Sequence, residues 1–226
     1  MKGVLYPGED DYPRLTWKLL VKAHKIALDG EPIDEIYQAI SKIVDANWHQ
    51  MRDLAVIMGG LLMFWNSAFY RTGHISFAHV ENTLLKHTIK LDEYRTRVIT
   101  TISPDEFKKI GEIYYEILYS FGARKNEKNG DGKKMIYSPV SAAKAMHLLC
   151  PNFFPLWDSS IAKAYGCYWD DTLYSFPEYW KFISKTKKQV ELLRTEGRPP
   201  KDIRGIPVLR LIDQYNYLCY TKKKCP

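Results

Sequence analysis

The sequence predicts an all-α fold, a compact multi-helix protein in which two helical lobes lie on either side of a cleft. Three observations support this prediction. Apolar residues recur at the three- and four-residue spacing of amphipathic helices along most of the 226 residues. No stretch alternates convincingly between apolar and polar residues, as a half-buried strand would. Capping residues followed by proline, as in Ser103-Pro104 and Ser138-Pro139, mark helix starts.

A single unit is expected over residues 1–226, because this length is enough to bury one substantial core. The two lobes are expected at about 48–135, and at 1–47 together with 136–226. Hydrophobic residues make up 46% of the chain and charged residues 26%, which excludes an intrinsically disordered protein. The sequence contains neither internal repeats nor low-complexity tracts.

Six helices are expected in the first half of the chain, after an irregular N-terminal arm. Their ranges are 13–28, 32–46, 49–70, 76–88, 91–101 and 103–121. The third contains the longest apolar run, residues 54–65, which is too short for a membrane span of about 20 residues. We therefore expect a buried central helix and no membrane association. Its Gly59-Gly60 pair lowers the stability of the helix by about 1 kcal/mol per glycine relative to alanine, unless another helix packs closely there.

A polar, glycine-containing loop is expected at 123–134, followed by four more helices. Their ranges are 139–149, 159–165, 177–196 and 206–221, with a stiff connector at 197–201. Ser138 and Asp158 are suitable N-caps for the first two of these helices. Pro151 and Gly166 follow their C-terminal ends.

The charge of the chain favours a polyanionic partner, with nucleic acid as the first candidate. The formal net charge is +7 and the pI is about 9.0. Sixteen tyrosines and six tryptophans suit base stacking, and equally an ordinary aromatic core. In the 123–134 loop, Arg124, Lys125, Lys133 and Lys134 are candidate phosphate contacts. The alternative, that such a cluster is simply a solvated surface, stays open.

The cysteine and histidine patterns indicate neither a metal site nor a secreted protein. Cys150, Cys167, Cys219 and Cys225 form no C-x-x-C pair and lack zinc or iron–sulfur spacing. The N-terminus shows no secretory signal, so we expect free thiols in a reducing compartment, either cytoplasmic or nucleoid-associated. The sequence contains no H-E-x-x-H, phosphate-loop or nucleophile-elbow motif. We therefore expect no metal ion and no cofactor.

The most informative stretch is residues 138–166, SPVSAAKAMHLLCPNFFPLWDSSIAKAYG. Its first helix is largely apolar, but Ser141, Lys144 and His147 lie three residues apart and form one polar stripe. Asp158 heads the next helix. One interpretation is that Lys144 and Asp158 face a common space. The other is that the stripe is a solvent-exposed face and that Asp158 is only a cap.

This order of a lysine-bearing helix, an extended crossing and an aspartate heading a new helix resembles the helix-hairpin-helix DNA glycosylase superfamily. In that family an L-P-G-x-G-x-K-x-A hairpin leads into a helix, and a V-D-x-H-V-x-R segment opens the next one. Here SAAKA at 141–145 matches the hairpin end and its lysine, and LWDSSIAK at 156–163 matches the V-D segment. The hairpin glycines are replaced by YSPVS at 137–141, and the lysine-to-aspartate spacing is shorter by about one helical turn.

The resemblance implies a DNA glycosylase, with or without Schiff-base AP-lyase activity. Such an enzyme would act as a monomer on double-stranded DNA with a flipped base. Lys144 would attack the sugar, and Asp158 would assist base removal. The other implied contacts to the substrate are His147, Trp157, Phe153 and Phe154, with Trp65 and Trp169 as further stacking candidates. The implied contacts to DNA are Ser138, Ser141 and Lys163.

Two other functions stay open at this point. The chain could be a non-catalytic helical nucleic-acid-binding protein on the same scaffold, or a protein-interaction module. Strong salt-dependent DNA binding would exclude the module. Loss of base excision with retained binding in Asp158→Asn would separate the enzyme from the non-catalytic binder.

Overall fold

A computed structural model of the chain describes residues 12–30, 33–71, 75–121, 123–125 and 135–226. Most of these residues are helical, so the predicted all-α fold is confirmed. The helices are α1 Trp17–Gly30, α2 Ile33–Ala46, α3 Met51–Trp65, α4 Ser67–Tyr70, α5 Phe77–Arg95, α6 Phe107–Ser120, α7 Pro139–Leu149, α8 Ser159–Ala164, α9 Phe176–Thr195 and α10 Val208–Asn216. Short 3₁₀ turns occupy Ile99–Thr101, Pro104–Glu106, Thr172–Tyr174 (η3) and Lys201–Ile203, and a π-helical turn, η5, occupies Tyr217–Thr221.

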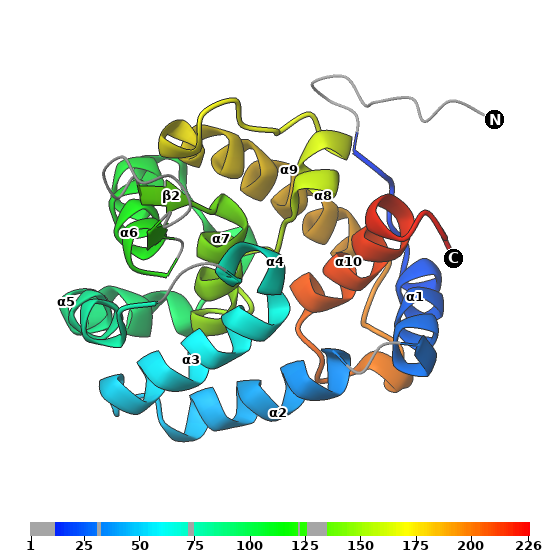
Figure 1. Cartoon of the computed structure of the whole chain (residues 1–226). Helices are drawn as coiled ribbons and strands as arrows, with labels where there is room; N and C mark the ends of the chain where they lie inside the picture. The colour runs from blue at the N-terminus through cyan, green and yellow to red at the C-terminus, as the bar shows by residue number, and fades with distance from the viewer. Residues whose placement is uncertain (1–11, 31–32, 72–74, 122, 126–134) are drawn as a thin grey trace.

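Helix α7 lies in the middle of the molecule, with α5 and α6 on one side and α1 and α10 on the other (Figure 1). It packs against α2, α3 and α6, while α1 pairs with α10 and α3 with α5. The buried apolar side chains form one connected core that runs from Leu15 to Ile212 and includes residues of both expected lobes. The division into two lobes stays a prediction.

The expected helix at 49–70 is interrupted at Asn66, so its predicted continuity is wrong. Asn66 has φ −129° and ψ 45°, outside the helical region, and α3 therefore ends at Trp65. The side-chain amide of Asn66 donates to the hydroxyls of Ser138 and Ser141 at the start of α7. These tertiary hydrogen bonds replace the continuation of the helix, which the local sequence did not indicate.

The expected pair of helices at 76–88 and 91–101 is instead one helix, α5, followed by a 3₁₀ turn. Thr88 lies at the expected interruption. Its hydroxyl donates to the carbonyl of Leu84 at 2.8 Å, which satisfies the polar side chain without leaving the helix.

A short β-hairpin precedes α7, so the expectation of no strands is wrong for two three-residue segments. Strands β1 Ala123–Lys125 and β2 Met135–Tyr137 pair antiparallel, with Ala123 opposite Tyr137. Three residues are too few for an alternating pattern to be recognisable. The hairpin leads directly into Ser138, the N-cap of α7.

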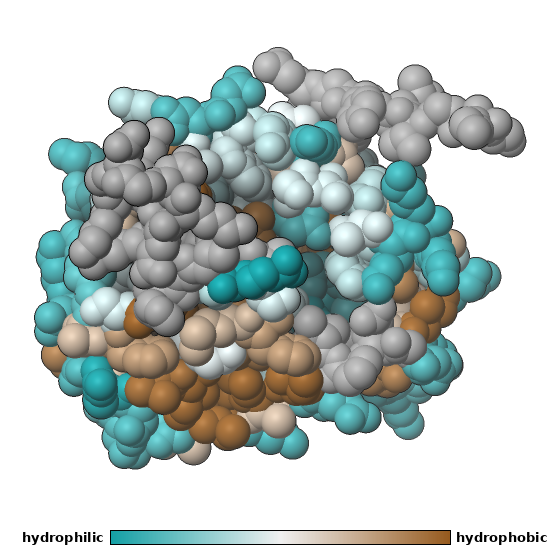
Figure 2. Space-filling view, viewed as in Figure 1, coloured by the Kyte–Doolittle hydropathy of each residue, from teal (hydrophilic) through white to brown (hydrophobic). Residues whose placement is uncertain are grey.

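Helix α3 is buried on one side only, so the prediction of a buried central helix holds for that side. Leu54 and Met58 are fully buried, whereas Val56, Met63 and Phe64 are exposed. Figure 2 shows a hydrophobic band on this face of the molecule, in the region where α3 lies. None of the helices in the described ranges is both long and apolar enough to cross a bilayer.

Two of the four cysteines are not free thiols, which corrects the expectation from the sequence. Cys219 and Cys225 form a disulfide, with their Cα atoms 4.2 Å apart. Cys150 and Cys167 are free and buried. The chain turns back after η5 and brings the two terminal cysteines together, which their six-residue separation alone does not reveal.

The close helix packing that the Gly59-Gly60 pair would require is present at Gly59 only. A Cβ atom at Gly59 would lie 2.6 Å from Cε1 of Phe77, at the start of α5. A Cβ atom at Gly60 would meet nothing within 4 Å.

Gly60→Ala should therefore raise the free energy of unfolding by roughly 0.5–1 kcal/mol, because alanine favours the helix and no contact opposes it. Gly59→Ala should be about 1–3 kcal/mol less stable than Gly60→Ala, because the added methyl group meets the Phe77 ring. Urea unfolding of the two variants and the parent measures both effects. Equal stabilities of the two variants would contradict the close packing of α3 and α5.

Candidate active site

Helix α7 carries the polar stripe into the interior of the protein. Ser138 caps the helix, accepting from the backbone N–H of Ser141 at 3.2 Å, and Pro139 occupies the first turn, as predicted. Ser141 and His147 are fully buried, and Lys144 is only partly exposed. The interpretation of the stripe as a solvent-exposed face is therefore wrong, because α2, α3 and α6 surround α7.

Ser138 and Ser141 anchor the interrupted helix α3–α4 to α7. Asn66 Nδ2 donates to Ser138 Oγ at 3.2 Å and to Ser141 Oγ at 2.8 Å. Both serine side chains are buried. Their predicted contact with DNA is contradicted, because the hydroxyls are used inside the protein.

Lys144 is held by the C-terminal end of α3. Its Nζ donates to the carbonyl oxygen of Trp65 at 3.1 Å and lies 4.8 Å from the centroid of the Trp65 ring. The last carbonyls of a helix lack intrahelical partners, and Lys144 satisfies this one. Burial lowers the pKa of Lys144 to about 8, and the nearby Arg210 adds to this shift, while Asp213 and Asp158 oppose it.

Asp158 caps α8, as predicted, and is fixed from its other side as well. Its Oδ1 accepts from the backbone N–H groups of Ser160 and Ile161, both at 2.8 Å. Its Oδ2 accepts from the hydroxyl of Thr221, in η5, at 2.7 Å. Asp158 is therefore more than a cap, since its second oxygen connects α8 to the C-terminal turn.

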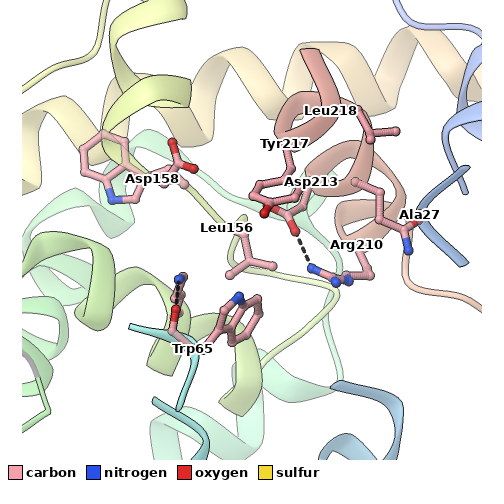
Figure 3. Close-up of a pocket in the computed structure, with 11 residues that line it drawn as sticks. Ala27, Trp65, Leu156, Asp158, Arg210, Asp213, Tyr217 and Leu218 are labelled. Atoms are coloured by element: carbon pink, nitrogen blue, oxygen red, sulfur yellow. Dashed lines mark hydrogen bonds and ion pairs between the residues drawn. The ribbon is translucent and has the colours of Figure 1, made fainter. Parts of the chain in front are cut away.

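Lys144 and Asp158 line the same cavity, which has a volume of about 150 Å³. This is the common space that one interpretation of the sequence predicted. In Figure 3, Asp158 lies on one side of the cavity and the paired Arg210 and Asp213 lie on the other. The remaining lining residues come from α1, the end of α3, the extended crossing, α10 and η5: Ala27, Trp65, Leu156, Trp157, Gln214, Tyr217 and Leu218.

The cavity also contains a charged pair, Arg210 and Asp213, which was not predicted from the sequence. They lie three residues apart on α10 and form an ion pair. Arg210 is 4% exposed, and its guanidinium lies 4.6 Å from the Tyr37 ring centroid and 5.6 Å from that of Trp65. The only signal in the sequence was an arginine and an aspartate at helical spacing, which is typical of surface helices as well.

His147 is part of the core, which contradicts its predicted contact with substrate. Its Nδ1 lies 2.8 Å from the carbonyl oxygen of Phe154, and its Nε2 lies 2.8 Å from the hydroxyl of Tyr37. A carbonyl can only accept, so Nδ1 carries the proton and Nε2 accepts from Tyr37. Burial lowers the pKa of His147 to about 3, so the ring is neutral.

The aromatic residues of the crossing divide between core and cavity. Phe153 and Phe154 are fully buried against Tyr94, with ring centroids 4.7 Å and 5.7 Å away, which contradicts their predicted stacking on a base. Trp157 is almost fully buried but lines the cavity, as does Trp65. Trp169 packs behind Trp157, at 4.9 Å between centroids.

The predicted DNA contacts of the basic residues stay predictions. Lys163 is exposed on α8, and its Nζ lies 4.6 Å from the ring centroid of Tyr168. Arg124 and Lys125 belong to β1, of which only the backbone is described. Lys133 and Lys134 lie outside the described residues.

No protein-family model, curated protein or solved structure matches the chain. The residues of the cavity themselves indicate its chemistry. It combines an amine that loses its proton easily, a carboxylate with a fixed orientation and an arginine–aspartate pair. Such a set can attack an electrophilic carbon and stabilise positive charge beside it.

Tyr37→Phe tests the structural role assigned to His147. Removing the hydroxyl leaves Nε2 of the fully buried ring without its donor, which should lower the free energy of unfolding by about 1–3 kcal/mol. Tyr174→Phe, at a residue that is 72% exposed, should leave stability within about 0.5 kcal/mol of the parent. Chemical denaturation compares them, and equal stabilities would contradict the buried hydrogen bond.

Proposed function

We propose that the chain is a DNA glycosylase that removes a flipped base and forms a Schiff base through Lys144. One observation carries this proposal: Lys144, whose pKa is lowered to about 8, and Asp158 line the same cavity. These are the two residues that the resemblance to the helix-hairpin-helix glycosylases assigns to catalysis. The positive net charge of the chain agrees with a DNA partner.

Asp158 is the electrostatic group of the proposed reaction. Positive charge develops on the sugar as the bond between C1′ and the base breaks, and a carboxylate beside that carbon stabilises it. The hydrogen bonds from Ser160, Ile161 and Thr221 keep the carboxylate in place, so it needs no rearrangement when the charge develops.

Lys144 is the nucleophile. At pH 7 an amine with a pKa of about 8 is neutral in about one molecule in ten, against less than about one in a thousand for an ordinary lysine. The bond between Nζ and C1′ forms as the bond between C1′ and the base breaks, and the departing base takes up a proton. The bond between C1′ and the ring oxygen then breaks, and that oxygen takes up the remaining amine proton. A double bond between C1′ and Nζ, the Schiff base, is left.

The cavity favours a single-ring base. Trp65, Leu156 and Tyr217 contribute apolar and aromatic surface between the two charged ends. A cavity of about 150 Å³ is known to hold one six-membered ring. We therefore expect a pyrimidine lesion to enter this space more readily than a purine lesion.

Borohydride trapping tests the proposal on oligonucleotides that contain an abasic site, uracil, 8-oxoguanine or an alkylated base. The parent protein should form a covalent adduct, and Lys144→Ala should lose it. Asp158→Asn should reduce base excision by about 10²–10³-fold, because it removes the charge but keeps a good N-cap. Gel-shift assays should show that both variants retain DNA binding.

Matched controls separate catalysis from folding. Asp171 caps η3 by accepting from the backbone of Leu173 at 2.9 Å and does not line the cavity, so Asp171→Asn should keep full activity. Lys181→Ala, at an exposed lysine, should keep the adduct. Base excision without a covalent adduct would indicate a glycosylase that depends on Asp158 alone. The absence of both excision and adduct would contradict the proposal.

The yield of trapped adduct should rise with pH. The neutral fraction of an amine with a pKa of about 8 rises about fiftyfold between pH 6 and pH 8 and then levels off. The initial trapping rate on an abasic site should follow this curve, because only the neutral amine attacks. A rate that continues to rise steeply up to pH 10 would contradict the lowered pKa of Lys144.

A protein-interaction role is the second candidate, and the exposed apolar side chains of α3 favour it. Val56, Met63 and Phe64 are exposed, and Figure 2 shows a hydrophobic band in the region where α3 lies. If the chain shows no excision and only weak DNA binding without salt dependence, this candidate replaces the enzyme.

A further inference from the structure

The C-terminal residues form a covalently closed ring beside the candidate active site. The disulfide between Cys219 and Cys225 closes this ring at the end of η5. Within the ring, Lys223 has φ 58°, the only positive φ at a non-glycine position in the described part of the chain. This conformation costs roughly 1–2 kcal/mol for an ordinary residue, so the segment needs a constraint to hold it.

The ring is connected to the cavity in two ways. Thr221, inside the ring, donates its hydroxyl hydrogen to Oδ2 of Asp158 at 2.7 Å. Tyr217 and Leu218, immediately before the ring, line the cavity, and their carbonyls accept from the backbone N–H groups of Lys222 and Lys224 at 2.9 and 2.8 Å. The same short segment therefore fixes the carboxylate and forms one wall of the cavity.

The disulfide is accessible to a reductant. Cys225 is exposed, and Cys219 is 8% exposed. Disulfides in reducing compartments are generally transient and serve catalysis or redox sensing, whereas in oxidising compartments they persist. The other two cysteines, Cys150 and Cys167, are free and buried. Among the described cysteines, a reductant therefore acts on the Cys219–Cys225 pair.

We propose that the Cys219–Cys225 disulfide is a redox clamp on the candidate site, which holds Thr221 against Asp158 and keeps the cavity wall in place. As a statement about catalysis, this inference rests on the proposed glycosylase function. In the disulfide form the site is assembled. In the reduced form the tail is released, Asp158 loses the Thr221 hydrogen bond, and the cavity opens at Tyr217 and Leu218.

The redox step is a thiol–disulfide exchange with a dithiol reductant. The dithiol loses two electrons and two protons and becomes a disulfide, while Cys219 and Cys225 each gain one electron and one proton and become thiols. In the laboratory the dithiol is dithiothreitol. A protein dithiol would perform the same exchange in a cell.

The experiment compares the full-length protein in its oxidised and dithiothreitol-reduced states by three readouts. Amide hydrogen exchange over residues 217–224 should be much faster in the reduced state. Reductive methylation of Lys144, followed by mass spectrometry, should be severalfold faster, because the cavity is more open. Base excision should fall about tenfold on reduction, the effect of losing one hydrogen bond to a charged group.

Three variants locate the effect. Cys225→Ser, at an exposed position, should behave like the reduced protein in both states. Thr221→Val should excise at the reduced rate in both states, because the hydroxyl that contacts Asp158 is gone. Thr195→Val is the matched control, since Thr195 is an exposed threonine whose hydroxyl donates to Leu192 within α9, and it should respond to reduction like the parent.

The possible results distinguish a failure of the clamp from a failure of the proposed function. Equal hydrogen exchange of the tail in the two states would overturn the clamp. Faster exchange with an unchanged excision rate would overturn its role in regulation. If no state of the protein excises any base, the proposed function fails. Hydrogen exchange and Lys144 methylation then test the clamp without it, and equal rates in the two states would overturn the clamp.

Discussion

The position of Lys144 depends on where helix α3 ends. The terminal carbonyl of Trp65 accepts from Lys144 Nζ, and the next residue, Asn66, binds the two serines at the start of α7. A helix that continued through Asn66 would use its carbonyls internally and would leave a partly buried ammonium without this acceptor. One interruption therefore sets both the register of α7 against α3 and the environment of the amine.

The same neighbourhood also fixes the crossing that leads to Asp158. Tyr37 donates to His147, which in turn donates to the carbonyl of Phe154, four residues before Asp158. Arg210 lies over Tyr37 and Trp65, so α10 is tied to α2 and to the end of α3 through aromatic–cation contacts. These contacts are buried, and they give the lysine and the aspartate fixed positions relative to each other although fourteen residues separate them in the sequence.

The sequence predicted what is determined locally and missed what depends on packing. The caps at Ser138 and Asp158 and both ends of α7 follow from the residues themselves. The interruption at Asn66 depends on serines more than 70 residues away, and the burial of the polar stripe depends on three surrounding helices. The functions expected for His147 and Phe153 failed for the same reason, because residues beside a motif in sequence need not face the cavity. Arg210 and Asp213 reach the site only through the fold.

The charges in the cavity explain why two aspartates can serve different purposes there. Two cations, Lys144 and Arg210, face two carboxylates, Asp158 and Asp213. Asp213 is paired with Arg210 on the same helix, whereas Asp158 is held by neutral hydrogen-bond donors. When Lys144 loses its proton, the cavity gains one net negative charge, and the carboxylate without a paired cation is Asp158. In the proposed reaction the deprotonation that creates the nucleophile thus also leaves an uncompensated carboxylate beside the sugar, where positive charge develops. Both changes favour the same proposed reaction, which is a physical reason for placing Lys144 and Asp158 in one partly desolvated space.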